Sequence, residues 1–580
     1  MIEKLLDLLD IEPVDDVPLL LAQLQRMQVD KLLNQHFPTH GNWAGELTFG
    51  EVVIVWLAFV ISQANHRLCR VEAWAAERLL LLSACLSKPV RALDLSDDRL
   101  ASILDLLGDP EKWAPFEREL NQSLLRVYDL RAQTARVDPT TVASYGEADG
   151  EGLLQFGHGK NGRADLMQLK VSLSTLDPMG LPLVTQIVGG ASADDPLYLP
   201  QIKQVQASLG RGGKLYVGDS KMGATQTRAY IASSGDYYLC PMSQVQLQAT
   251  PLPQLVEPVW SGRQALRPVV HPVSKELLGL GFEYAVELSC EVEGQTVKWI
   301  ERRLVARSLV WAEHQVEGLA RRLSNATTAI ERFNQRKRGK KRLSEAELTR
   351  ACEKIVKKHE TGEIVRWEVI SVESEAAASG ARRNKGQTAV ETQVRYEIDQ
   401  EALTLAQQMM GWRVYATNQP QSEGGLGQVV AAYREQYQIE RGIGRLKGQP
   451  LGLEPLYISD ETRLRGLVHL LTIALRLLCL TEFTARRALK QESQVEDRKL
   501  RGLYAYQPGR ATESPTSETM LEAFSGLKLK TIEVDGKRYA SMTPLNTAQA
   551  RILKLLGFSS EIYDRLPHHL LELGFYLSEP

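Results

Sequence analysis

The stretch AAYREQYQIERGIGRLKG, residues 431–448, decides how the rest of the sequence is interpreted. Its pattern predicts a helix that carries an aromatic residue, an acid and a base at intervals of seven residues, namely Tyr433, Glu440 and Lys447. Seven residues are close to two helical turns, so the three side chains are expected along one stripe. One helix does not explain why these three types share a stripe, so the reason lies elsewhere in the chain.

Length and composition describe an ordinary folded protein. The chain has 580 residues, of which 43% are hydrophobic and 24% charged, and its net charge is −2. This length predicts three or four structural units. The balanced charge excludes a uniformly basic nucleic-acid binder, so any DNA binding has to come from local patches.

Cysteine use and hydropathy favour an intracellular protein. The six cysteines are scattered without a C-x2-C pair, which argues against a zinc site or a disulfide framework. The apolar runs 52–62 and 466–480 are too short or too interrupted to span a bilayer, and they predict buried helices. We therefore expect a cytoplasmic protein without a membrane partner.

Two aspartates far upstream lie at expected strand ends. Asp138 follows the β-rich run QTARV, and Asp219 ends the run KLYVG. Between them, two further strand patterns joined by the turn DPMG precede a helical stretch, which gives the order strand, strand, strand, helix, strand. In this arrangement the first strand is central and the fourth lies beside it. The two acids then become neighbours despite a separation of 81 residues.

A third acid on a packed helix, Glu440, would complete a set of three carboxylates that converge in one cleft. Mg²⁺ prefers such oxygen ligands. Two ions about 3.5–4 Å apart can activate an attacking oxygen and stabilise a leaving one. The pattern predicts a ribonuclease H-like fold with a metal site at Asp138, Asp219 and Glu440. Taken singly, each acid has another explanation: a turn or cap for Asp138, a cap of a helix starting at Ser220 for Asp219, and a solvated residue for Glu440.

With these three acids and the helical stretch 431–448, the chain resembles the DDE-type transposases of bacterial insertion sequences, in the branch with the signature Y-x2-R-x3-E-x6-K (YREK). Tyr433, Glu440 and Lys447 match the spacing, whereas Gln436 stands where the signature has arginine. The resemblance covers roughly residues 130–480 and extends to RVDPTTVASYG, GHGKNGRADLMQLKVSL, YVGDSKMG and LKGQPLGLEPLYISDETRLRGLVHLL.

The resemblance implies a metal-dependent DNA transposase that uses Mg²⁺ (or Mn²⁺), with two ions. Its partners would be double-stranded DNA, as terminal inverted repeats and target, and a second copy of the chain in a homodimer on DNA. Its place would be the bacterial cytoplasm, associated with the nucleoid. Two rival interpretations are a catalytically silent DNA-binding regulator derived from a transposase and a ribonuclease H-like nuclease.

The expected fold class is a multidomain α/β protein whose ribonuclease H-like mixed-sheet core carries a largely β insertion. We expect five parts: a helical DNA-end-recognition domain at 1–130, the first part of the core at 131–223, a β-rich insertion with a basic helical segment at 224–400, the second part of the core with the Glu440 helix at 401–500, and a region for dimer or DNA contact at 501–580.

Several residues are candidates for DNA contact. The resemblance implies this role for Tyr433, Gln436 and Lys447, although Tyr433 and Lys447 taken singly could be a core and a surface residue. Gln436→Arg is expected to strengthen end binding or leave it unharmed. The run RKRGKKR is either a solvated loop or a phosphate-contact patch formed by Arg336, Lys337, Arg338, Lys340, Lys341 and Arg342. His158 and Lys160 lie in a glycine-rich loop and are either loop residues or part of the site.

Overall fold

The computed structural model describes most of the chain. The exceptions are residues 1–8, 40–42, 147–148, 158, 160–161, 164, 336–342, 375–388, 505, 508, 535–536, 572–575 and 578–580. The chain divides into two compact units. Unit 1 comprises Met1–Cys240, Ser289–Trp299 and Arg434–Pro580, and unit 2 comprises Pro241–Leu288 and Ile300–Tyr433.

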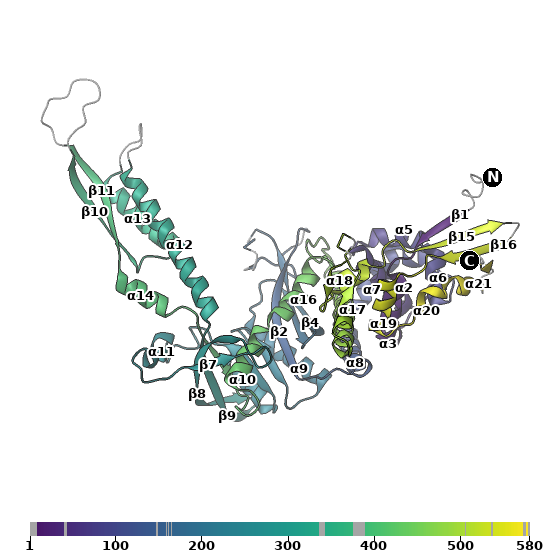
Figure 1. Ribbon diagram of the computed structural model, residues 1–580, viewed down its shortest axis with the longest axis horizontal. Coiled ribbons are helices and arrows are strands. Elements are labelled where there is room, and N and C mark those ends of the chain that lie inside the picture. Colours follow the sequence, from purple (N-terminus) through teal and green to yellow (C-terminus); the bar gives the residue numbers. More distant parts are fainter. Residues whose placement is uncertain are drawn as a thin grey trace, which may run out of the picture. The chain divides into compact units, whose positions relative to one another are not determined.

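Unit 1 contains a mixed sheet with the strand order β4-β3-β2-β5-β6, of which β2 and β4 are labelled in Figure 1. Strands β2, β3 and β4 form an antiparallel meander, and β5 and β6 run parallel to β2. The predicted order is therefore confirmed, with the first strand between the second and the fourth. The strands are β2 (Thr134–Ala143), β3 (Gln168–Leu176), β4 (Leu181–Gly189), β5 (Leu215–Gly218) and β6 (Tyr237–Pro241).

Helices connect and cover this sheet. α9 (Asp195–Leu209) joins β4 to β5, and α10 (Thr225–Ser233) joins β5 to β6. α16 (Tyr437–Lys447) packs against β2 and β3. Both α10 and β6 fall in the range expected for the insertion, but β6 pairs in parallel with β5 and so continues the sheet of unit 1. The two units thus divide the chain at different places from the five expected parts.

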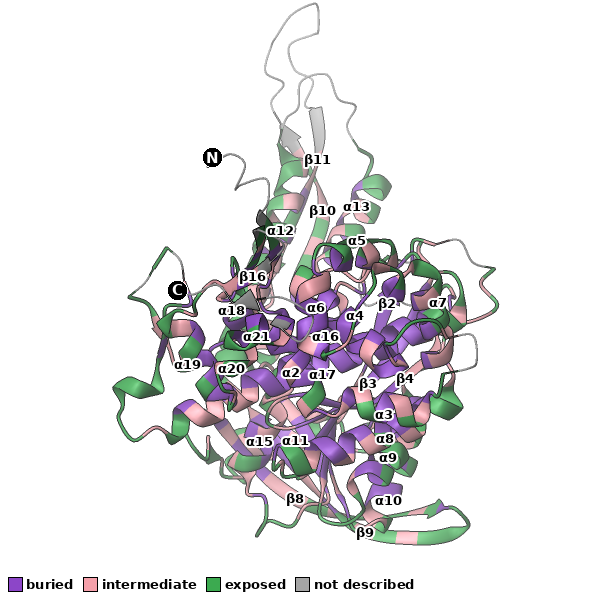
Figure 2. Cartoon of the chain, turned by 90° about the vertical axis from the view of Figure 1, so that its right-hand side faces the viewer, coloured by how far each residue is buried: buried purple, intermediate pink, exposed green. Residues whose placement is uncertain are grey.

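A helical layer surrounds α17 (Glu461–Gln491), which packs against α7, α4, α19 and β4. Figure 2 shows that many residues of α17, α2 and α4 are buried. Among the described residues α17 is the single helix long and apolar enough to cross a membrane, and 94% of its most apolar window is buried inside the protein. The expected N-terminal helices are present: α2 (Val17–Arg26), α3 (Val29–His36), α4 (Phe49–Gln63), α5 (Val71–Ala76), α6 (Leu79–Leu86), α7 (Asp97–Leu107) and α8 (Pro110–Val127).

The two ends of the chain meet in a small sheet, in which the pairing of the N-terminal strand was not predicted from the sequence. β1 (Leu9–Pro13) pairs with β15 (Lys528–Val534), which forms an antiparallel hairpin with β16 (Lys537–Met542). A short β17 (Tyr576–Leu577) adds to β16. The other C-terminal elements are β13 (Leu500–Arg501), β14 (Ala511–Thr512), α18 (Ser517–Glu522), α19 (Thr547–Leu556), α20 (Glu561–Asp564) and α21 (Leu566–Leu571).

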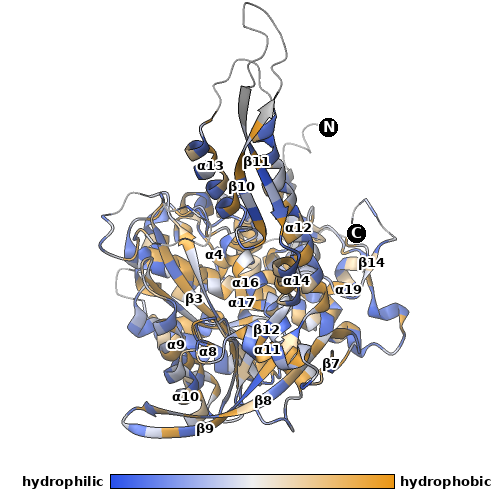
Figure 3. Ribbon diagram, turned by 90° about the vertical axis from the view of Figure 1, so that its left-hand side faces the viewer, coloured by the Kyte–Doolittle hydropathy of each residue, from blue (hydrophilic) through white to orange (hydrophobic). Residues whose placement is uncertain are grey.

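Unit 2 is rich in strands, as expected. Its larger sheet has the order β7-β8-β9-β12, burial alternates along part of β8 and of β9, and Figure 3 shows the changes of hydropathy along β9. A separate hairpin, β10 and β11, packs its apolar face against α12 and α13. The elements are α11 (Leu252–Trp260), β7 (Arg267–Val270), β8 (Leu277–Val292), β9 (Gln295–Arg307), α12 (Leu309–Asn334), α13 (Glu345–Lys358), β10 (Val365–Ser374), β11 (Ala389–Ile398), α14 (Gln400–Gln408), β12 (Trp412–Thr417) and α15 (Leu426–Arg434).

Candidate active site

Asp138 and Asp219 occupy neighbouring positions in the sheet of unit 1. The parallel pairing of β2 with β5 runs up to Val137 opposite Gly218, and each aspartate is the next residue of its chain. Neighbouring strands lie about 4.8 Å apart, so the two backbones leave this pairing side by side. The strand order that places the two acids next to each other is thus present.

Asp138, however, does not end its strand. β2 continues through Pro139 to Ala143 and stays paired with β3, with Asp138 opposite Leu173. Only β5 stops here. Pro139 has no N–H group to donate, which suits a strand position whose neighbour on one side has just ended. The acids therefore sit where the central strand loses its parallel neighbour.

Tyr198, in the first turn of α9, contacts one of these acids. Its hydroxyl donates a 2.6 Å hydrogen bond to Oδ1 of Asp219. Burial raises the pKa of Tyr198 well above its usual value, and the charges of Asp219 and Asp138 raise it further. The phenol therefore stays protonated and acts as a fixed donor that orients Asp219. Sequence reasoning missed this residue because a tyrosine on the buried face of a helix carries no distinguishing pattern.

Asp219 also organises the turn that follows it. Its Oδ1 accepts the backbone N–H of Lys221 at 2.8 Å, and the chain turns from Ser220 to Gly223 before α10 begins at Thr225. The alternative of a cap for a helix starting at Ser220 is wrong, since a turn occupies that place. Among the described residues Oδ2 of Asp219 takes no hydrogen bond, so one oxygen remains for another ligand.

Helix α16 lies along β2 and is fixed to it near both ends. Nη1 of Arg136 donates to Oε1 of Gln436 at 3.4 Å, and Nζ of Lys447 donates to the carbonyl of Thr141 at 2.7 Å. The eleven residues from Gln436 to Lys447 in the helix and the five residues from Arg136 to Thr141 in the strand both span about 16 Å, so the two contacts can form together. The apolar side chains beneath the helix are Ile439, Ile443 and Leu446, all buried.

This placement brings Glu440 level with Asp138. Glu440 lies four residues beyond Gln436, about 6 Å along the helix, and Asp138 lies two residues beyond Arg136, also about 6 to 7 Å along the strand. Arg136 and Asp138 share a face of β2 because strand side chains alternate. Glu440 is exposed, and within the described part of the chain its carboxylate forms no hydrogen bond or ion pair.

The three carboxylates do not form one compact cluster. In the part of the chain that the structure describes, no three His, Cys, Asp or Glu side chains lie close enough together to hold a metal ion. The structure thus brings Asp138 and Asp219 together and leaves Glu440 on the adjacent helix, outside that pair. The donor chemistry fits the expected ions, because carboxylate oxygens are the ligands that Mg²⁺ prefers.

The single stripe predicted for the quoted stretch is wrong, because the helix is interrupted. α15 ends at Arg434 and α16 begins at Tyr437, with a turn between them. Both turn residues reach one buried cation: the guanidinium of Arg136 lies 3.6 Å from the Glu435 carboxylate and 3.4 Å from the Gln436 amide oxygen.

Arg136 is itself held firmly. Its guanidinium binds the Asp177 carboxylate through two hydrogen bonds of 2.8 and 2.7 Å, and its side chain is fully buried. Burial raises the pKa of Asp177, while the charge and hydrogen bonds of Arg136 act in the opposite direction. A guanidinium therefore does stand beside position 436, but it comes from β2 and not from the signature helix.

The expected DNA-contact residues have different surroundings. Tyr433 belongs to unit 2, where its ring lies 5.0 Å from that of Tyr415 and 5.7 Å from the guanidinium of Arg413. The Lys447 ammonium, besides its bond to Thr141, lies 3.2 Å from the Glu454 carboxylate. DNA contact by Tyr433, Gln436 and Lys447 stays a prediction. The basic run 336–342 and the loop residues 158 and 160 lie outside the described residues.

The order of the sheet, its crossing helices and the paired acids define a ribonuclease H-like core. The chain belongs to the family described as transposase DDE domain, whose match covers residues 130–477. That range begins just before β2 and ends inside α17, so it includes every acid of the candidate site. No curated protein matches the chain. The protein is thus a DDE-type transposase, a class of metal-dependent DNA-processing enzymes, while its assignment to the YREK branch stays a prediction.

Proposed function

We propose that this transposase cuts the ends of an insertion sequence and joins them to target DNA, with Asp138, Asp219 and Glu440 as its catalytic and metal-binding residues. The observation that supports this most strongly is the parallel register of β2 and β5, which sets the two aspartates side by side where β5 ends. Two Mg²⁺ or Mn²⁺ ions, when bound, would activate the attacking oxygen and stabilise the leaving one.

The residues around the acids have separate tasks in this proposal. Tyr198 fixes Asp219 through Oδ1, so that Oδ2 is presented in one direction. Glu440 lies level with Asp138 on an exposed helix face. A change of its rotamer or a small shift of α16 would bring its carboxylate toward the pair. Arg136 and Lys447 hold α16 along β2 and so set the position from which Glu440 acts.

The remaining parts would serve DNA binding and assembly. We infer that residues 1–130 recognise the terminal inverted repeats, that 501–580 contact DNA or a second copy, and that the run 336–342 contacts phosphates. A homodimer on DNA would hold two element ends together, in the cytoplasm where the DNA lies.

The test uses the full chain and DNA ends taken from the sequences that flank its own gene. With Mg²⁺, the wild type should nick the ends and join them to a target plasmid. Asp138→Asn, Asp219→Asn and Glu440→Gln should each lower cleavage by about 10²–10³-fold or more, because a carboxamide keeps the shape but loses the charge. End binding should change little. Glu313→Gln, at an exposed position of α12, is the matched control and should cleave like the wild type.

The outcomes separate the rival functions. Cleavage without joining would favour a nuclease, and specific end binding without cleavage in Mg²⁺ or Mn²⁺ would favour a silent regulator. A carboxamide variant that cleaves at the wild-type rate would remove its residue from the site.

A further inference from the structure

A second polar site lies on the opposite side of α16 from the packing against β2. A cavity of about 430 Å³ opens between α16, α17 and the turn after β3. This volume is within the usual range of ligand pockets. Five cationic side chains line it, contributed by both helices: Arg441, Arg445, Arg486, Arg487 and Lys490.

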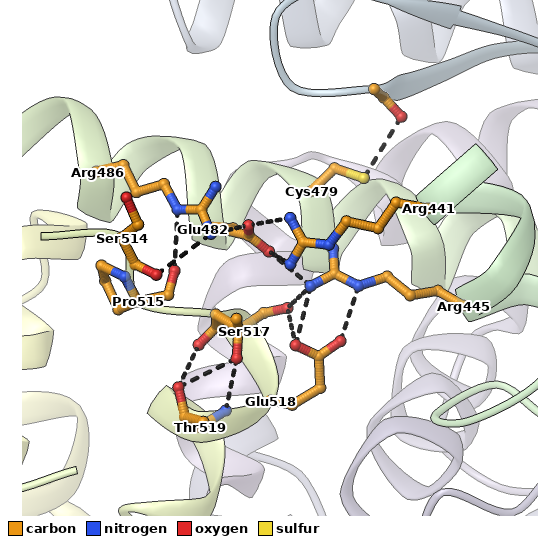
Figure 4. Close-up of polar contacts among 12 residues, drawn as sticks. Arg441, Arg445, Cys479, Glu482, Arg486, Ser514, Pro515, Ser517, Glu518 and Thr519 are labelled. Carbon is orange, nitrogen blue, oxygen red and sulfur yellow. Dashed lines mark hydrogen bonds and ion pairs between the residues drawn. The ribbon is translucent and has the colours of Figure 1, made fainter. Parts of the chain in front are cut away.

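Few carboxylates balance these cations. Glu482 is the one acid in the lining, and it accepts hydrogen bonds from Arg441 at 2.5 and 2.9 Å and from Arg445 at 2.6 Å, with Arg486 also paired to it (Figure 4). Glu518 binds Arg445 at 2.8 Å from the other side. Burial opposes ionisation of Glu482, but the arginines outweigh it and hold the pKa below its usual value. Five positive charges thus face two carboxylates.

Donors remain for an external anion. A guanidinium carries five N–H groups, and a carboxylate partner occupies only some of them. Arg441 is 39% exposed at the mouth of the cavity. Lys490 is exposed at the end of α17, and among the described residues its ammonium has no hydrogen-bond or ion-pair partner.

The rim of the cavity is apolar and aromatic. Tyr437 is 61% exposed and is the first residue of α16, the helix that carries Glu440. Met179 and Phe483 also line this side of the cavity. Cations beside exposed aromatic rings are the surface that nucleic-acid strands use, with phosphate on the cations and sugar or base against the rings.

Resting on the proposed function, we propose that this pocket binds the sugar–phosphate backbone of a DNA strand, with a phosphate at Arg441 and Lys490 and the adjoining nucleoside against Tyr437. Arg441 directly follows Glu440 in α16, so the bound phosphate belongs to the DNA close to the reacting bond. The pocket would then fix the strand relative to the active site through the same helix.

The experiment measures binding of a labelled DNA duplex of about 30 base pairs as a function of salt. The test variant is Arg441→Gln combined with Lys490→Gln, which leaves Glu482 paired with Arg445 and Arg486. The control is Arg463→Gln on the same α17, 45% exposed and paired with Asp105, as Arg441 is paired with Glu482. The test variant should bind about tenfold more weakly at 0.1 M salt and lower the salt slope by about one or two units. The control should stay within about twofold, and thermal melting should show both variants folded.

A second measurement locates the phosphate. A set of duplexes carries one neutral methylphosphonate linkage at a time. One of these linkages should weaken DNA binding by the wild type but not by the Arg441→Gln variant, because the variant lacks the guanidinium that would contact the phosphate at that position. If the test variant binds DNA with the same affinity and salt slope as the wild type, the proposal that this pocket binds DNA is overturned, but the proposed function is not. Equal loss in the test and control variants would do the same. Wild type that binds no DNA would overturn the proposed function as well.

Discussion

Helices α16 and α17 pack against each other in unit 1, yet the middle of α17 and the exposed face of α16 place their polar side chains in opposite ways. In α17, His469 and Arg476 are buried and bonded to other parts of the chain: the imidazole Nδ1 to the Leu107 carbonyl at 2.7 Å and the guanidinium to Glu117 at 2.7 Å. In α16, Glu440 is exposed, as is much of Arg441. The difference separates polar groups that stabilise the fold from those available to bind a ligand.

The largest effect should come from the buried pair of α17. Glu117→Gln removes the negative charge beside Arg476, whose side chain is fully buried. An uncompensated buried charge costs about 3–5 kcal/mol, so the free energy of unfolding should fall by that amount. Urea unfolding followed by tryptophan fluorescence measures it.

The matched control is Asp105→Asn, which breaks the exposed ion pair between Asp105 of α7 and Arg463 of α17. Exposed pairs contribute about 0–1 kcal/mol, so this variant should lose less than 1 kcal/mol. Equal losses in the two variants would contradict the distinction between the buried and the exposed ion pair of α17.

A smaller effect concerns the buried histidine of α17 and pH. Burial lowers the pKa of His469 to about 3, and its ring stacks on Trp113 with 4.1 Å between centroids. The unfolded chain takes up a proton below about pH 6.5, whereas the folded chain does not, so stability is present above 6.5 and is lost as the pH falls toward 3. Between pH 7 and 5 this loss is about 2 kcal/mol.

The measurement compares wild type with His469→Asn, whose amide N–H can still donate to Leu107. Comparison of variants is needed because burial raises the pKa of Asp16 to about 6, which acts in the opposite direction between about pH 6 and 4. Both proteins share Asp16, so its contribution cancels. The variant should lose about 2 kcal/mol less than wild type between pH 7 and 5. Parallel stability curves would show that His469 is charged in the folded protein.

The strand order and the neighbouring aspartates could be predicted from the sequence because alternating strands and the DPMG turn are local signals. Three features could not. Tyr198 meets Asp219 only through the packing of α9, and β1 finds β15 across more than 500 residues. The turn before Tyr437 contacts Arg136, which lies 300 residues earlier in the sequence than Gln436. Each depends on a long-range contact that leaves no mark on local periodicity.

The smallest effect concerns this break in the helix at the start of α16. The signature alone leads one to expect that arginine at 436 helps or does no harm, but the guanidinium of Arg136 already lies 3.4 Å from the Gln436 oxygen. Gln436→Arg places a second cation there, partly offset by the Glu435 carboxylate 3.6 Å from Arg136. Two cations about 4 Å apart near a protein surface repel by a few kcal/mol before such compensation, so a net loss of about 1 kcal/mol is expected.

The decisive measurement is a double-mutant cycle with Arg136→Gln. Because the double variant again has one guanidinium and one amide at this position, its loss of stability should be smaller than the sum of the two single losses by at least about 0.5 kcal/mol. Additive losses would mean that the two side chains act independently, and the turn between α15 and α16 would then need another cause.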